Sequence, residues 1–335
     1  MGGGRKVGKL LFAQTTEIFN PNLNNGLPAN LAADDPTTSF TIKGIDINMA
    51  AYMSELAYLA NPVSSHLQAA EMHNQSINSL AFVSARMTHQ AVELVSMMAS
   101  SHLFIACQAL DLRAIQLDFF SEISSILVDI NKHHLDSYVP KVQLVDWNLV
   151  LVSRIQEAWK GAFRLDVIER FDKIFEQALP VLLQALERSL PGTAPKNILG
   201  VIQVWGQALR QRLAAKYQEI FNQFQKAPNT TEYLGVGGRA LYSVIRNGLK
   251  LPFHLGVTDP PVGFDDHGES KRTRRTVGSW VSIIYEALLE GKIVDVLHNA
   301  KQHTSLAEER YGTRSKGNGN QNGTKETHNG TYGSH

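Results

Sequence analysis

The chain has 335 residues, of which 43% are hydrophobic and 19% charged, a composition typical of a globular protein with one large or two medium domains. The formal net charge of +1 gives no reason to expect a nucleic acid or an anionic membrane surface as a partner. The single cysteine, Cys107, excludes a disulfide framework, so we expect a cytoplasmic protein in which Cys107 is a small buried hydrophobic residue.

The N-terminal part predicts a short helix followed by a long loop. Residues 6–20 carry apolar side chains at helical spacing, with no long apolar core before them, so we expect no secretory signal. Residues 20–39 are rich in Asn, Gly, Pro and Asp and predict a connection of roughly twenty residues. Its apolar residues Leu23, Leu27 and Leu31 favour an ordered, functional loop.

Two further helices follow, and the second is unusually long. Helical spacing over residues 45–59 stops at Pro62, because proline cannot continue a helix. Residues 66–113 contain no proline or glycine and repeat apolar residues every three to four positions, which predicts a helix of ~45 residues, about 65–70 Å long. Helices of this length are typical of bundles and coiled coils, often between subunits.

The start of this long helix contains the first candidate site. Glu71, Gln75 and Asn78 fall at i, i+4 and i+7, so they would share one helical face. Such a polar stripe needs water, a ligand or buried hydrogen-bond partners.

The rest of the chain continues in helical patterns, over residues 119–130, 149–163, 167–190, 198–224 and 281–297. Residues 257–270 predict a loop, and residues 305–335 have the composition of a disordered tail. Strand alternation of any length is missing, which predicts an all-α fold. The histidines lack the spacing with acidic or cysteine partners that a metal site needs, so we expect no metal.

Five motifs in order along the chain point to one family: Gly8–Gln14, Asn24–Leu31, Ser54–Val63, Glu71–Leu80 and Ala106–Arg113. With these motifs the chain resembles the histidine/phenylalanine aromatic amino-acid ammonia-lyase family, most closely phenylalanine ammonia-lyases of fungal type. The resemblance is dense over residues 6–113 and looser to about residue 300.

The resemblance implies a fold and a reaction. The fold is the ammonia-lyase/fumarase-like helical fold, a central bundle of very long helices with a C-terminal helical extension, assembled as a homotetramer whose active sites each use three chains. The reaction is the carbon–nitrogen lyase step of phenylpropanoid metabolism and phenylalanine catabolism, the non-oxidative deamination of L-phenylalanine to trans-cinnamate and ammonia. Residues 1–5 lie outside the family sequence, 6–113 correspond to part of the catalytic core, 114–304 to the extension and 305–335 to the tail.

The family uses methylidene-imidazolone (MIO), an electrophile formed by cyclisation of an Ala-Ser-Gly triplet, and this sequence contains no such triplet. The nearest string, Ala99-Ser100-Ser101, lies mid-helix and lacks the glycine. We therefore expect a truncated chain that resembles the C-terminal half of a lyase and is inactive alone. Its expected partners are L-phenylalanine or a related aromatic amino acid and other lyase subunits, with no nucleic acid and no membrane. The alternative function is a non-catalytic helical subunit or scaffold that assembles with a full-length lyase.

Five residues fall at site positions of the family, and Phe40 lies two residues before one of them, Ile42. Glu71 matches an acidic residue near the substrate amino group, where a carboxylate could accept a proton or hold the ammonium. Gln75 matches a glutamine in the hydrogen-bond network around the base tyrosine and the substrate. These two are the catalytic candidates, and the substrate-binding candidates are Asn25, Phe40, Ile42 and Asn74. The alternative at each position is structural: a paired carboxylate, a turn, plain core or a bracing contact.

Overall fold

The computed structural model describes residues 2–139, 141–190, 197–256, 259 and 275–298, without the side chains of 141–145. All regular elements among these residues are helices, and their one β contact is an isolated bridge between Ala70 and Gln75. The prediction of an all-α fold is therefore confirmed.

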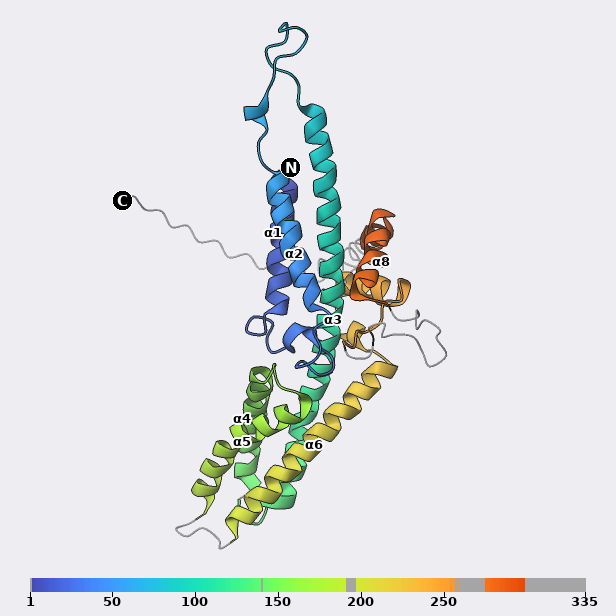
Figure 1. Ribbon diagram of the computed structural model, residues 1–335. Coiled ribbons are helices and arrows are strands. Elements are labelled where there is room, and N and C mark those ends of the chain that lie inside the picture. The colour runs from blue at the N-terminus through green and yellow to red at the C-terminus, as the bar shows by residue number, and fades with distance from the viewer. Residues whose placement is uncertain (1, 140, 191–196, 257–258, 260–274, 299–335) are drawn as a thin grey trace, which may run out of the picture.

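One helix, α3 (Ala81–Leu135), forms the spine of the molecule (Figure 1). Its 55 residues correspond to a length of about 80 Å. A very long helix was predicted, but its bounds differ from the expected 66–113, because α3 starts later and includes the pattern at 119–130 as one continuous helix. One 18-residue window of α3 is apolar enough to span a membrane, yet 44% of that window is buried inside the protein, as in the core helix of a globular domain.

Helices α1 (Gly2–Phe19) and α2 (Lys43–Leu59) pack along the N-terminal half of α3, as Figure 1 shows, and match the predicted helices at 6–20 and 45–59. Their shared core includes Met49, Leu56 and Met98, each at most 1% exposed. Cys107 belongs to the same core, and burial raises the pKa of its thiol to about 12. The interpretation of Cys107 as a buried hydrophobic residue is therefore confirmed.

The C-terminal half of α3 packs against α4 (Lys141–Gly161) and α6 (Ile198–Lys226), and α5 (Val167–Ser189) packs against these two helices. In chain order, the three helices correspond to the predicted helices at 149–163, 167–190 and 198–224. Aromatic rings fill the centre of this second core, where Phe119 contacts Trp159 at a centroid distance of 4.9 Å and Tyr217 at 5.5 Å. Edge-to-face and tilted ring pairs of this kind add stability beyond their buried area.

The chain then returns to the N-terminal half of α3. The short elements η3 (Thr230–Tyr233), α7 (Val236–Ser243) and the π-helical turn η4 (Val244–Gly248) lead to α8 (Val277–Leu289), which packs against α3. The predicted helix at 281–297 begins earlier, because the Thr276 side chain caps α8 by accepting from the Ser279 N–H, and it is interrupted at Gly291, where φ is +80°.

The predicted domain division at 113/114 remains a prediction, since α3 runs through it without a break. The predicted tail at 305–335 lies outside the described residues, as does the loop at 257–270 apart from residue 259.

Candidate functional site

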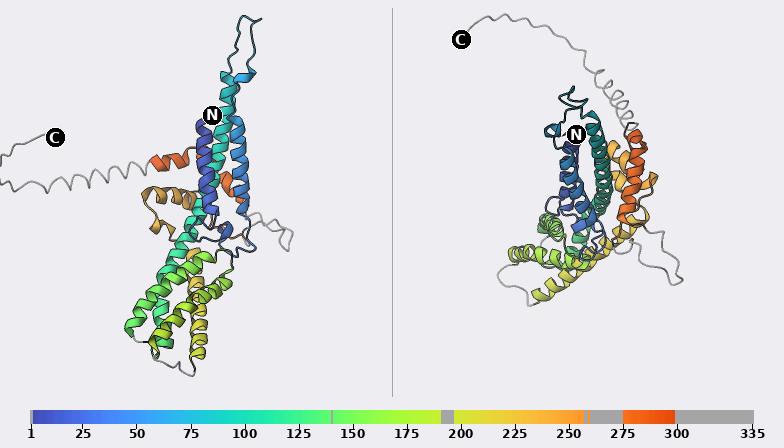
Figure 2. Two further views of the ribbon diagram at one scale, coloured as in Figure 1. Left: turned by 90° about the vertical axis from the view of Figure 1, so that its left-hand side faces the viewer. Right: turned by 45° about the horizontal axis from the view of Figure 1, so that its top comes forward.

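The candidate residues Glu71, Asn74 and Gln75 lie in the connection between α2 and α3, which we call the tip loop (residues 67–80). Figures 1 and 2 show that this loop projects beyond the end of the helices. The prediction that Glu71, Gln75 and Asn78 share a helical face is wrong, because α3 begins only at Ala81. Asn and Ser side chains compete for backbone hydrogen bonds and favour turns over helix, which explains the late start.

Local hydrogen bonds define the tip loop. Ala70 and Gln75 exchange two backbone bonds, with N···O distances of 2.9 and 3.1 Å, and the Asn78 side chain accepts from the Gln68 N–H at 3.0 Å. Between the paired residues, Glu71, Met72 and His73 have φ values of +53°, +51° and +69°. Left-handed conformations of non-glycine residues cost ~1–2 kcal/mol each, so this turn is strained.

The side chains of the tip loop are presented outward. The Asn74 amide donates to the Glu71 carboxylate at 3.3 Å, and the Gln75 side chain forms no hydrogen bond within the described part of the chain. Glu71, Asn74 and Gln75 are all exposed. The loop therefore offers one carboxylate and two amides to whatever faces it.

Asn25 lies in a second loop, next to the middle of α3. Arg113 of α3 fixes this loop by donating to the carbonyl oxygens of Asn24 at 2.6 Å and Asn25 at 3.2 Å. Gly26 follows with φ +82°, and a Cβ there would lie 2.6 Å from the Cα of Lys160, so only glycine fits the turn. The Asn25 backbone is thus held rigidly while its side chain stays exposed.

The two apolar candidates have different environments. Phe40 is 52% exposed, whereas Ile42 is 2% exposed and belongs to the core of the N-terminal half. Within this chain Ile42 has the environment of a core residue, which was the alternative considered for it.

The six candidates do not form one site within a single chain. Ala81, where the tip loop ends, and Arg113, which holds the Asn25 loop, are 32 residues apart on one helix, or roughly 48 Å. Glu71, Asn74 and Gln75 form one group, and Asn25 belongs to another.

A buried polar cluster went unnoticed in the sequence. The Asp111 carboxylate, 1% exposed, accepts from Thr230 Oγ1 at 2.6 Å, from Arg246 at 2.5 Å and from the Tyr242 hydroxyl. Burial and the Asp111 charge raise the pKa of Tyr242. The cluster attaches the segment that contains η3, α7 and η4 to α3. Asp111 is more than 100 residues from the other three members in sequence, so no motif spacing indicated the cluster.

The residues do not fit the formation of the prosthetic group that the resemblance implies. Ala99-Ser100-Ser101 lies inside α3, where the Ser100 hydroxyl donates to the Ser96 carbonyl at 2.8 Å. A continuous helix without glycine at the third position does not allow the backbone to fold back and cyclise.

Comparison with known proteins connects the chain to one family. Residues 4–129 match the family model of the aromatic amino acid lyases. The chain is 45% identical over 301 residues to a phenylalanine ammonia-lyase of Aspergillus hancockii, covering 88% of this chain and 43% of that protein. It is 39% identical to a phenylalanine aminomutase (L-beta-phenylalanine forming) of Talaromyces islandicus, covering 87% of this chain and 40% of that protein.

A solved structure agrees with these matches. The crystal structure of phenylalanine ammonia-lyase from Rhodosporidium toruloides superposes with a TM-score of 0.78 at 31% sequence identity, covering 89% of this chain and 45% of that chain. The chain thus spans less than half the length of the relatives that it matches. Residues 4–129 thus match the family model of the aromatic amino acid lyases, and the chain is similar to fungal phenylalanine ammonia-lyases over less than half of their length.

Proposed function

We propose that this chain contributes active-site residues to an aromatic amino acid ammonia-lyase that converts L-phenylalanine to trans-cinnamate and ammonia. The observation that carries the proposal is the 45% identity to a phenylalanine ammonia-lyase over 88% of the chain. The chain is also similar to an aminomutase that is named for forming L-beta-phenylalanine. The finer question is therefore whether the amino group is released as ammonia or returned to the carbon skeleton.

The residue roles follow from the chemistry of the reaction. The proton on Cβ of the substrate is barely acidic and the ammonium must leave, so the site needs a group that holds the ammonium. In our proposal Glu71 does this through a charge-assisted hydrogen bond, and Gln75 and Asn74 orient the substrate and the groups around it. Asn25 and Phe40 line the substrate pocket, and Ile42 supports it from the core.

The proposed site is shared between chains. The roughly 48 Å between the tip loop and the Asn25 loop prevents one chain from bringing both to the same substrate. We propose that the tip loop of one chain meets the Asn25 loop of another in a lyase oligomer. Two features support this arrangement: the strained turn at Glu71–His73 and the exposure of Met72 (97%) and Phe82 (83%).

The test is complementation of an inactive relative. A full-length fungal phenylalanine ammonia-lyase, in which the residue aligned with Glu71 is changed to glutamine, is co-expressed with this chain. We expect the chain alone to produce no cinnamate, because it lacks the Ala-Ser-Gly triplet, and the mixture to recover activity when Glu71 enters the partner's site. Cinnamate is followed by ultraviolet absorbance, and β-phenylalanine by chromatography.

Matched variants make the result specific. Glu71→Gln in this chain is expected to abolish the recovery, whereas Glu17→Gln, an exposed carboxylate on α1, leaves it intact. Equal recovery with both variants, or turnover of L-phenylalanine by the purified chain alone, contradicts the proposal. Mixed oligomers without recovered activity indicate the scaffold alternative instead.

A further inference from the structure

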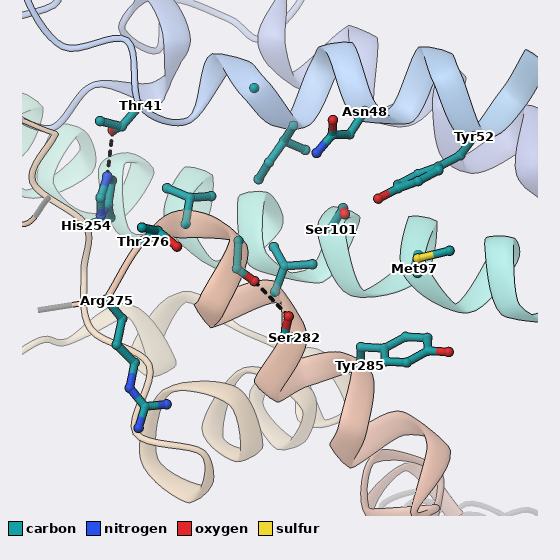
Figure 3. Close-up of a pocket in the computed structure, with 15 residues that line it drawn as sticks. Thr41, Asn48, Tyr52, Met97, Ser101, His254, Arg275, Thr276, Ser282 and Tyr285 are labelled. Atoms are coloured by element: carbon teal, nitrogen blue, oxygen red, sulfur yellow. Dashed lines mark hydrogen bonds between the residues drawn. The ribbon is translucent and has the colours of Figure 1, made fainter. Parts of the chain in front are cut away.

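A cavity of about 690 Å³ lies where α2, α3 and α8 meet, away from the tip loop (Figure 3). Small-molecule sites in proteins typically enclose about 300–1,000 Å³ and combine apolar walls with a few polar groups. This cavity has both. Ile45, Met97 and Val281 form apolar walls, and the rings of Tyr52 and Tyr285 lie on opposite helices at one end.

The first polar group of the cavity is Ser101. Its hydroxyl has no hydrogen-bond partner among the described residues, and although the residue is only 4% exposed, this oxygen lines the cavity and is not sealed from solvent. Its neighbour Ser100 shows the usual solution, since its hydroxyl bonds the carbonyl of Ser96 in the preceding turn. A hydroxyl that opens onto a cavity and has no protein partner is free to bond a ligand there in place of water.

Two more polar side chains face the same space. Figure 3 places Asn48 and Tyr52 of α2 across the cavity from Ser101. Neither side chain makes a hydrogen bond within the described part of the chain. Together the three side chains offer both donors and acceptors, which suits a hydroxyl group that donates one bond and accepts another.

The cavity is also uncharged where these groups converge. None of its lining residues is acidic. Arg275 lines the rim, but its guanidinium lies over the Trp280 ring at 5.3 Å and points away from Ser101 in Figure 3. At the far end, His254 bonds the Thr41 hydroxyl at 2.7 Å, and burial lowers the pKa of this histidine, which keeps it neutral. A charged ligand would therefore lack a counter-ion.

We propose that this cavity is a binding site for a small uncharged phenol, separate from the lyase site. The ligand's ring lies among Ile45, Met97 and the two tyrosines, and its hydroxyl bonds Ser101 and Asn48. An aromatic body matches the ring-lined end, and a single hydroxyl can bond the Ser101 and Asn48 side chains without introducing charge.

The test uses the full chain and ¹⁹F NMR with 4-fluorophenol as the probe, and fluorobenzene and 4-fluorobenzoate as its non-hydroxylated and charged counterparts. We expect line broadening for 4-fluorophenol, about fivefold to tenfold weaker binding of fluorobenzene, and no binding of 4-fluorobenzoate. Ser101→Leu fills the cavity and is expected to abolish binding. Ser101→Ala, which adds no bulk, is expected to weaken 4-fluorophenol binding about fivefold.

Ser100→Ala is the matched control, because it removes a hydroxyl from the same helix turn that is already satisfied within α3. Far-ultraviolet circular dichroism establishes that each variant is folded, and if Ser101→Leu does not fold, Ser101→Ala decides. The proposal is overturned if the parent chain binds no 4-fluorophenol, if fluorobenzene or 4-fluorobenzoate binds as tightly, or if Ser100→Ala weakens binding as much as Ser101→Ala. None of these readouts depends on ammonia-lyase activity.

Discussion

His254 links three distant segments of the chain. Its imidazole bonds Thr41 in the loop before α2, and its backbone N–H and carbonyl bond the Gln108 side chain of α3 at 3.0 and 2.9 Å. Its Nδ1 lies 3.6 Å from Asp259. With 2% of its surface exposed, this histidine is withdrawn from water, and burial lowers its pKa.

This burial predicts a loss of stability in mild acid. Desolvation lowers the pKa of His254 and outweighs the opposite effects of Asp259 and Asp34, while Arg246 lowers it further. Below about pH 6.5 the unfolded histidine binds a proton that the folded one does not, so the free energy of unfolding falls as the pH falls, by at most about 1.4 kcal/mol per pH unit. Urea unfolding between pH 7.5 and about pH 5 measures this slope.

The matched pair for this prediction is His254→Gln and His66→Gln. A glutamine side chain has no proton to gain, so the slope of the free energy of unfolding against pH should be smaller in His254→Gln. Part of the slope should remain, because burial also lowers the pKa of His102. His66 is exposed and its replacement should leave the slope unchanged. An identical slope in the parent and in His254→Gln would show that the histidine is not buried in its neutral form.

At the residue scale, the sequence was informative where a turn depends on residue type alone. The Asn-Gly pair at 25–26 predicted its turn, because asparagine and glycine tolerate positive φ. Glu71 was placed on the wrong element, since periodicity continued through Asn74 and Asn78 although their side chains favour a turn. Ser101 and His254 could not be identified at all, because the residues around them come from segments up to 213 positions apart.

Among the elements, α3 was the most predictable. Its period and the absence of proline and glycine indicated a very long helix, and the same features continue to Leu135 beyond the predicted end. The ends were missed because a helix start depends on local capping and turn competition, which periodicity does not measure. The packing partners of α3 were beyond sequence reasoning, since they depend on which faces meet after the chain turns back.

A single buried side chain, Asn131, joins three of these helices. Its carbonyl oxygen accepts from the Trp205 indole of α6 at 2.7 Å, and its amide donates to Asn148 of α4 at 2.6 Å. Asn131 and Trp205 are 1% and 0% exposed. Asn131→Ala leaves the indole N–H without a partner, so we expect the free energy of unfolding to fall by about 2–3 kcal/mol in urea titrations.

The control for this prediction is Asn222→Ala on the exposed face of α6, which should change the free energy of unfolding by less than about 0.5 kcal/mol. A double-mutant cycle with Trp205→Phe then measures the Asn131–Trp205 coupling directly. If Asn131→Ala is as mild as Asn222→Ala, the three helices do not depend on this hydrogen-bond pair.

At the scale of the molecule, two hydrophobic cores follow one another along α3, and the tip loop extends beyond both (Figure 2). The upper core gathers α1, α2 and α8, and the lower core gathers α4, α5 and α6. The tip loop belongs to neither and carries Met72 and Ile77, which are 97% and 67% exposed. Large exposed apolar side chains on a projecting loop are typical of a surface that another chain covers.

The dynamics of the tip loop should therefore depend on assembly. In the isolated chain its backbone hydrogen bonds are solvent-exposed and backed by no core, so we expect its amides to exchange with deuterium close to the unprotected rate. In a mixed oligomer with the full-length fungal lyase, contact with the partner should slow exchange of residues 67–80 by at least about tenfold, corresponding to roughly 1.4 kcal/mol of local stabilisation. Hydrogen-exchange mass spectrometry measures both states, with the exposed residues 225–227 at the end of α6 as an internal reference whose exchange should not change. Unchanged exchange of the tip loop in a verified mixed oligomer would mean that the loop faces solvent there too, and Glu71 could not then enter a shared active site.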